Sequence, residues 1–257
     1  MPVAFQLDHA TRRYGSLAAV DEISLTIEEG EQLAFIGPSG SGKTTLIRLL
    51  NAMVIPSSGD VSLFGESVTG LGVKQLRQLR TRIATIPQHL GLVENLSVLQ
   101  NVMLGRGGTR GTWGSLRDLL VPAAKDVARV HEILDRVGIE EKLYARTSSL
   151  SGGQQQRVAI ARALYQEPEV ILADEPVSSV DPARARDTVS LLTELSKEQG
   201  FTLCVSLHHL ELALEFFPRV VGMRQGGMVF DAAPDTLDES ELEELYQLSD
   251  EEMMRDA

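Results

Sequence analysis

Residues 37–44 read Gly37-Pro38-Ser39-Gly40-Ser41-Gly42-Lys43-Thr44 and fit the pattern G-x-x-x-x-G-K-[ST]. A short apolar segment, 32–36, precedes them and a helix-favouring segment, 44–53, follows. Glycines let a backbone wrap closely around a phosphate, and N–H groups at a helix N-terminus then face the anion. Lys43 would place a charge on the terminal phosphates, and the Thr44 hydroxyl would reach Mg²⁺. The motif therefore predicts a strand, a phosphate-binding loop and a helix, with Thr45 as a further nucleotide-binding residue.

Strand-like and helix-like segments alternate along most of the chain. The expected strands are 3–8, 18–27, 32–36, 61–64, 83–87, 169–173, 202–206 and 219–224, and the expected helices are 44–53, 153–166, 182–198 and 209–217. Such alternation requires crossover connections and a largely parallel sheet, so the fold class is α/β. Between about 89 and 150 the pattern changes to helical pieces, which predicts an inserted helical subdomain.

Two adjacent carboxylates end an apolar segment. Val170–Ala173 has the composition of a buried strand, and Asp174 and Glu175 follow it directly. In an open α/β sheet the carboxyl ends of the strands line the ligand crevice. We therefore expect Asp174 to hold the Mg²⁺ shell and Glu175 to act as general base on the attacking water.

Composition limits the environment and the partners. The single cysteine, Cys204, excludes an intrachain disulfide and suits a reducing compartment; it lies in an apolar segment and is expected in the core. Residues 235–257 carry −9 of the formal net charge of −12, an acidic end that argues against binding to nucleic acid or anionic lipid. No run of eighteen apolar residues is present, so no membrane span is expected.

The most specific segment reads Leu150-Ser151-Gly152-Gly153-Gln154-Gln155-Gln156-Arg157. Here the chain resembles the ATP-binding subunits of ABC transporters, and the resemblance covers roughly residues 3–245. It implies a P-loop NTPase (RecA-like) core with an antiparallel β subdomain. It also implies that Ser151, Gly152, Gly153 and Gln154 meet the γ-phosphate of an ATP held by the loop of a second subunit. Physically, this segment opens a helix, whose N-terminus favours an anion.

Further residues match family positions one at a time. Tyr14 matches the aromatic residue that stacks on adenine, and Gln88 the glutamine that joins the Mg²⁺ site to the membrane partner. Ser178-Ser179-Val180-Asp181 resembles the segment that crosses to the other subunit, with Val180 where leucine is common. His208 matches the histidine that contacts the γ-phosphate, although its neighbour His209 is the alternative. Pro87, where phenylalanine is common, would stiffen the Gln88 hinge.

Finer resemblance concerns the cargo. Segments 91–106, 111–116, 206–208 and 226–231 are similar to those of phosphonate-importer ATPases. Importers of phosphite or other phosphorus oxyanions look much the same, and these segments could instead reflect general importer ancestry. Trp113 could anchor a partner or simply pack. His9 and His131 have no partner spacing and are expected at the surface.

The implied organisation is an ATP-binding core (1–88 and 154–234), a helical subdomain with the signature segment (89–153), and an acidic helix and tail (235–257). The implied cofactors are ATP and Mg²⁺. The implied partners are a second copy in the ATP-bound state, two permease subunits and, indirectly, an extracytoplasmic binding protein, which places the chain on the cytoplasmic face of the inner membrane. Rival functions are less well matched. A DNA-repair ATPase would carry coiled coils or zinc modules, and a translation factor would carry two ATP-binding domains. An exporter would have a fused membrane domain or a different partner.

Overall fold

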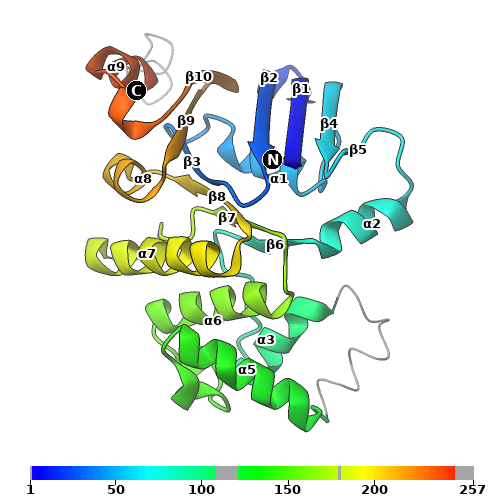
Figure 1. Cartoon of the computed structure of the whole chain (residues 1–257), viewed down its shortest axis with the longest axis vertical. Coiled ribbons are helices and arrows are strands. Elements are labelled where there is room, and N and C mark those ends of the chain that lie inside the picture. Colours follow the sequence, from blue (N-terminus) through cyan, green and yellow to red (C-terminus); the bar gives the residue numbers. More distant parts are fainter. Residues whose placement is uncertain (1, 108–120, 179–180, 247–257) are drawn as a thin grey trace.

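The computed structural model describes residues 2–107, 121–178 and 181–246. These residues form two sheets with helices around them (Figure 1). A four-stranded antiparallel sheet has the order β2-β1-β4-β5, and its strands are β1 Val3–Tyr14, β2 Leu17–Glu28, β4 Ser58–Leu63 and β5 Glu66–Ser67. A six-stranded sheet has the order β10-β9-β3-β8-β7-β6, and its strands are β3 Gln32–Ile36, β6 Ile83–Ile86, β7 Val170–Asp174, β8 Thr202–Leu207, β9 Arg219–Arg224 and β10 Gly227–Ala232.

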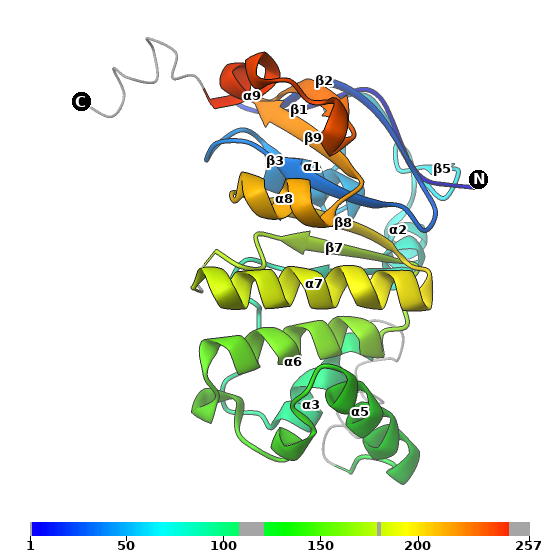
Figure 2. The same ribbon diagram turned by 60° about the vertical axis from the view of Figure 1, so that its left-hand side comes forward.

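The helices lie in two groups. Near the sheets are α1 Lys43–Leu50, α2 Val73–Thr81, α7 Pro182–Gln199, α8 Leu210–Phe216 and α9 Glu239–Tyr246, and further away are α3 Val98–Met103, α5 Ala124–Arg136 and α6 Gly152–Tyr165. Short 3₁₀ turns occupy Leu104–Arg106, Glu140–Lys142, Thr147–Ser149 and Pro234–Thr236. In both ribbon views α6 and α7 run side by side, with α3 and α5 packed on the far side of α6 (Figure 2). No described helix combines the length and the apolar character that crossing a bilayer requires.

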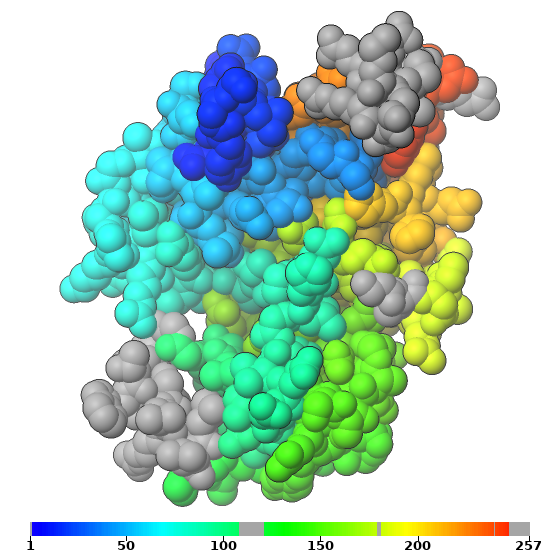
Figure 3. All heavy atoms as spheres, turned by 180° about the vertical axis from the view of Figure 1, so that it is seen from behind, coloured from blue at the N-terminus to red at the C-terminus, as the bar shows by residue number. Residues whose placement is uncertain are grey.

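The two faces of the large sheet bury different cores. Ala34 and Ile36 of β3 pack in the core that the helical layer covers, whereas Leu33 and Phe35 pack in the core around α1 and the small sheet. This alternation follows from the two-residue period of a strand, and the strand is buried on both faces, as in parallel sheets generally. Seen from behind, the N-terminal strands (blue) lie above and the helical residues (green) below (Figure 3).

The expected parallel sheet is confirmed for β9, β3, β8, β7 and β6, and the antiparallel sheet is also present. Helix α2 and strands β5 and β10 were not expected. Helix α2 has nine residues and fully buries only Leu79, with Leu76 partly buried against the same core. Strand β10 pairs antiparallel with β9 through the Gln225–Gly226 turn, where both residues have positive φ angles. Within the acidic end, α9 is described and residues 247–257 lie outside the described residues.

Candidate active site

The phosphate-binding loop lies between β3 and α1, where the sequence predicts it. Two of its glycines, Gly37 and Gly42, are required by close backbone contacts. A Cβ on Gly37, whose φ is +145°, would lie 2.1 Å from the Met223 carbonyl oxygen, and a Cβ on Gly42 would lie 2.2 Å from that of Ala19. These separations are far below van der Waals contact, so only glycine fits at either position. The loop is thereby held between β9 and the start of β2.

Lys43 is buried and folded back onto its own loop. Its Nζ donates to the carbonyl oxygens of Gly37 at 2.8 Å and Pro38 at 3.1 Å. Burial lowers the pKa of Lys43 from its ordinary value, and the charges of Glu175 and Asp174 act in the opposite direction. A bound triphosphate could replace the two carbonyl oxygens as the partner of this ammonium group.

Strand register brings two predicted metal-site residues together. Asp174 is the last residue of β7 and faces the same core as Leu172, toward α1, because side chains alternate along a strand. Thr44, in the first turn of α1, donates its hydroxyl to Asp174 Oδ1 at 3.1 Å. A hydroxyl and a carboxylate beside a phosphate loop are oxygen donors of the kind that Mg²⁺ prefers, so these residues fit the ion.

Glu175 is the centre of the second group. Its carboxylate accepts a hydrogen bond from Gln88 Nε2 at 2.9 Å, and its other oxygen lies 2.5 Å from His208 Nε2. Gln88 follows β6 and His208 follows β8, so the three residues lie just beyond the carboxyl ends of parallel strands, the usual location of a ligand crevice. His208, and not His209, makes the contact with Glu175. The predicted members Lys43, Thr44, Gln88, Asp174, Glu175 and His208 thus lie around one location.

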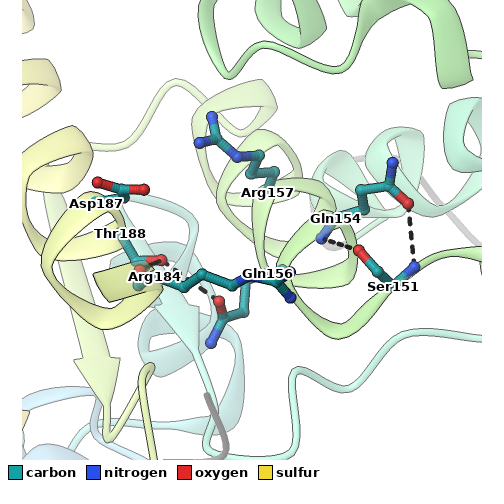
Figure 4. A pocket seen from close by; sticks show the side chains of 8 residues that line it. Ser151, Gln154, Gln156, Arg157, Arg184, Asp187 and Thr188 are labelled. Carbon is teal, nitrogen blue, oxygen red and sulfur yellow. Dashed lines mark hydrogen bonds between the residues drawn. The ribbon is translucent and has the colours of Figure 1, made fainter. Parts of the chain in front are cut away.

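The segment Ser151–Gln154 lies in a different place. Ser151 is the N-cap of α6: its Oγ accepts the Gln154 N–H at 3.4 Å, and Gln154 Oε1 accepts the Ser151 N–H at 3.0 Å. Figure 4 shows Ser151 and Gln154 at the start of α6, in a pocket that residues of α7 such as Arg184 and Asp187 also line. None of the Lys43 and Glu175 group lines this pocket.

The remaining predicted residues lie at separate positions. Tyr14 ends β1 and is 43% exposed, with the Arg12 guanidinium 4.8 Å from its ring centre, which leaves its other face for a base. Asp181 caps α7 by accepting the Arg184 N–H. Cys204 is buried, as expected, and His9 and His131 are exposed, as expected. Trp113, Ser179 and Val180 lie outside the described residues.

Two residues near the site were missed by sequence reasoning. Arg162 of α6 donates to the carbonyl oxygens of Leu90 and Gly91 (2.6 Å to Gly91). These two residues come just after Gln88, so the contact ties the chain after Gln88 to the helix that Ser151 caps. Ser206 hydrogen bonds both Asp174 and the Glu175 backbone. The sequence offers no local signal for Arg162. Ser206 does have one, because a serine in the otherwise apolar end of β8 needs a hydrogen-bond partner.

Comparison with known proteins gives concordant findings. The family model for "ABC transporter" matches residues 20–178. The "Phosphonates import ATP-binding protein PhnC" of Anaeromyxobacter dehalogenans is 46% identical over 95% of this chain, which spans about half (48%) of that protein's length. The protein of the same name from Pseudomonas putida is 43% identical over 95% of this chain and 90% of its own length.

Solved structures agree in fold. A dimeric post-hydrolysis state of the ATP-binding cassette MJ0796, bound to ADP and Pi, is 30% identical with a TM-score of 0.77, over 90% of this chain and 98% of that one. The cbiO1 protein of Clostridium perfringens, part of the transporter complex cbiONQ, is 27% identical with a TM-score of 0.79, over all of this chain and 94% of that one.

Proposed function

The chain belongs to the ABC transporter family as one of its ATP-hydrolysing subunits, and we propose that it drives import of a phosphonate or a related phosphorus oxyanion. The observation that carries the catalytic part is the arrangement around Glu175. A carboxylate held by Gln88 and His208, beside a phosphate loop and an Asp174–Thr44 pair, has the groups that phosphoryl transfer to water needs.

Each residue of the site has a separate role in ATP hydrolysis. Glu175 takes the proton of the attacking water, for which one of its present hydrogen-bond partners must give way. His208 and Gln88 orient this carboxylate and the water, and Lys43 offsets charge on the terminal phosphates. Tyr14 stacks on the adenine. Mg²⁺, held by Thr44, Asp174 and Gln88, would supply charge neutralisation of the β- and γ-phosphates.

We further propose that the working unit is a homodimer with two shared sites. The support is that none of the Lys43 group lines the pocket beside Ser151 and Gln154, together with the dimeric cassette among the similar structures. In a head-to-tail dimer the N-terminus of α6, with Gly152 and Gly153, would face the partner's γ-phosphate. Asp181 would lie near the crossing between the subunits.

The dimer is tested by mixing inactive chains. Ser151→Arg should spoil the site that its chain completes for a partner, and Lys43→Ala should spoil the chain's own loop. Mixed dimers of the two variants then hold one doubly defective site and one intact site. Partial recovery of ATPase activity, absent from each variant alone, is expected. Mixed dimers that form without any recovery would contradict a shared site in which one intact copy suffices.

Coupling to transport is proposed to pass through the segment after Gln88. Residues 89–153 would form the helical subdomain that contacts two permease subunits at the cytoplasmic face of the membrane, while 1–88 and 154–234 form the ATP-binding core. Arg162 supports this assignment, because it links Leu90 and Gly91 to the helix that Ser151 opens. An extracytoplasmic binding protein would act on the permease and not on this chain.

The cargo is proposed from the names of the similar proteins and from segments 91–106 and 206–231. The test is calorimetry on the binding protein encoded beside this chain's gene, with a phosphonate, phosphite, an amino acid and a metal ion as ligands. Tight binding of a phosphonate or phosphite, and of neither other ligand, is expected. Tight binding of an amino acid or a metal ion would replace the cargo and leave the ATPase assignment intact.

A further inference from the structure

Ser206 is a buried polar residue at the point where β7 and β8 end. It is 0% exposed, and in the parallel pairing of the two strands it lies opposite Asp174. Ser206 follows Thr202 and Cys204 at two-residue spacing and therefore faces α1 and the phosphate loop, as Asp174 does. A buried hydroxyl without a hydrogen bond is costly, so its partners indicate what it does.

The two hydrogen bonds of Ser206 have a defined direction. Its Oγ accepts the backbone N–H of Glu175 at 2.8 Å, and it lies 2.8 Å from Asp174 Oδ1. A carboxylate oxygen only accepts, so the single hydroxyl proton of Ser206 goes to Asp174. Oδ1 of Asp174 then receives both Ser206 and Thr44. Both bonds fix the rotation of the carboxylate beside the phosphate loop.

The bond to Glu175 supports an unfavourable backbone conformation. Glu175 has a φ of +48°, in the left-handed region that costs a residue with a side chain about 1 kcal/mol or more. It lies one residue beyond the last pair of the β7–β8 ladder, and its N–H bonds the Ser206 side chain. This conformation directs the Glu175 carboxylate toward Gln88 and His208.

We propose that Ser206 is a positioning residue of the ATPase site, whose one hydroxyl both orients Asp174 toward Mg²⁺ and holds the backbone turn that presents Glu175. The proposal rests on the roles assigned above to Asp174 and Glu175. It assigns to one side chain two effects that are measured separately, namely the gain in nucleotide affinity that Mg²⁺ gives and the turnover at saturating Mg²⁺.

The experiment compares binding of a non-hydrolysable ATP analogue to the full chain with Mg²⁺ and with EDTA, by calorimetry. Ser206→Ala removes both hydrogen bonds, and Ser206→Thr keeps the hydroxyl. Ser196→Ala is the matched control, because Ser196 is also a buried serine, 2% exposed, whose Oγ donates to the Phe201 carbonyl oxygen at 2.8 Å in a different part of the fold. The quantity compared is the ratio of Kd in EDTA to Kd in Mg²⁺.

For Ser206→Ala we expect this ratio to fall about tenfold, the loss typical of one hydrogen bond to a charged group, with Kd in EDTA within about twofold of wild type. Turnover at saturating Mg²⁺ should fall at least about tenfold. Ser206→Thr should recover both, and Ser196→Ala should lower only the unfolding midpoint. If Ser206→Ala does not fold, Ser206→Cys, of similar size and with a weak S–H donor, should show the same loss.

A wild-type ratio in Ser206→Ala, or an equal loss in Ser196→Ala, would overturn the proposal and leave the ATPase assignment standing. A wild-type chain whose affinity is indifferent to Mg²⁺ would overturn the assigned metal site and this proposal with it. The two failures are therefore distinguishable in one set of titrations.

Discussion

Replacing Glu175 with glutamine is the most direct test of the catalytic assignment. The side chain keeps its size and one carbonyl oxygen, which can still accept from Gln88 Nε2, now 2.9 Å away. Its new NH₂ group would face His208 Nε2, so the histidine must present the other tautomer there. Folding is therefore preserved, whereas the amide cannot take a proton from water. The loss of a general base corresponds to 10²–10⁴-fold in turnover, or about 3–5 kcal/mol of transition-state stabilisation.

The assay is phosphate release at saturating Mg·ATP, with ATP affinity and dimer content measured on the same samples. Lys43 and the loop N–H groups are untouched, so affinity should stay within about threefold of wild type, and the ATP-bound dimer should accumulate. Glu169→Gln is the matched control, because Glu169 immediately precedes the same strand at its other end and pairs with Arg82 at the surface. Turnover of Glu175→Gln within a factor of about three of wild type, or an equal loss in Glu169→Gln, would refute the assignment.

Three further changes test the surrounding structure. Gly37→Ala should lower the free energy of unfolding, measured by urea titration, by more than about 2 kcal/mol and abolish nucleotide binding, because its Cβ would lie 2.1 Å from the Met223 carbonyl oxygen. Near-wild-type stability would show that the loop can move. Arg162→Ala should lower the free energy of unfolding by about 1.5–3 kcal/mol and speed proteolysis near Gly91. Unchanged cleavage would show that the hydrogen bonds to the Leu90 and Gly91 carbonyl oxygens do not hold that part of the chain. Burial raises the pKa of the Cys204 thiol, so a disulfide reagent should label it only along the unfolding transition, and labelling of the native chain would contradict its burial.

The sequence predicts the catalytic elements well where a local pattern matches a local structure. The loop at 37–44 and the strands 32–36 and 170–174 occur where the glycines and the uninterrupted apolar residues indicate them. Both faces of these strands are covered, so their residues form a continuous apolar run that is easily identified as a buried strand. The choice of His208 over His209 could be made from its distance to the strand end, and the structure brings His208 to Glu175.

What sequence reasoning missed depends on partners far along the chain. The contact of Arg162 with Leu90 and Gly91 joins positions about 70 residues apart, and no spacing rule relates them. The role of Ser206 depends on the strand register that places it opposite Asp174, and the register of two strands cannot be read from either segment alone. Helix α2 was missed although Leu76 and Leu79 face the core three residues apart, because the segment is short and its other residues are mostly polar or charged.

The C-terminal end of helix α6 is held by segments far along the chain. Near its C-terminal end, Arg162 holds Leu90 and Gly91, and Gln166 donates to the carbonyl oxygens of Thr81 and Ile83; at its other end the chain enters through Ser151. Its 14 residues form a rod about 21 Å long. Ser151 lies about 16 Å along the helix from Arg162, so a tilt of about 10° about Arg162 would move Ser151 by about 3 Å, the length of a hydrogen bond. In the shared site proposed above, a small displacement beside Gln88 would therefore be enough to move Ser151 into or out of reach of the partner's phosphate.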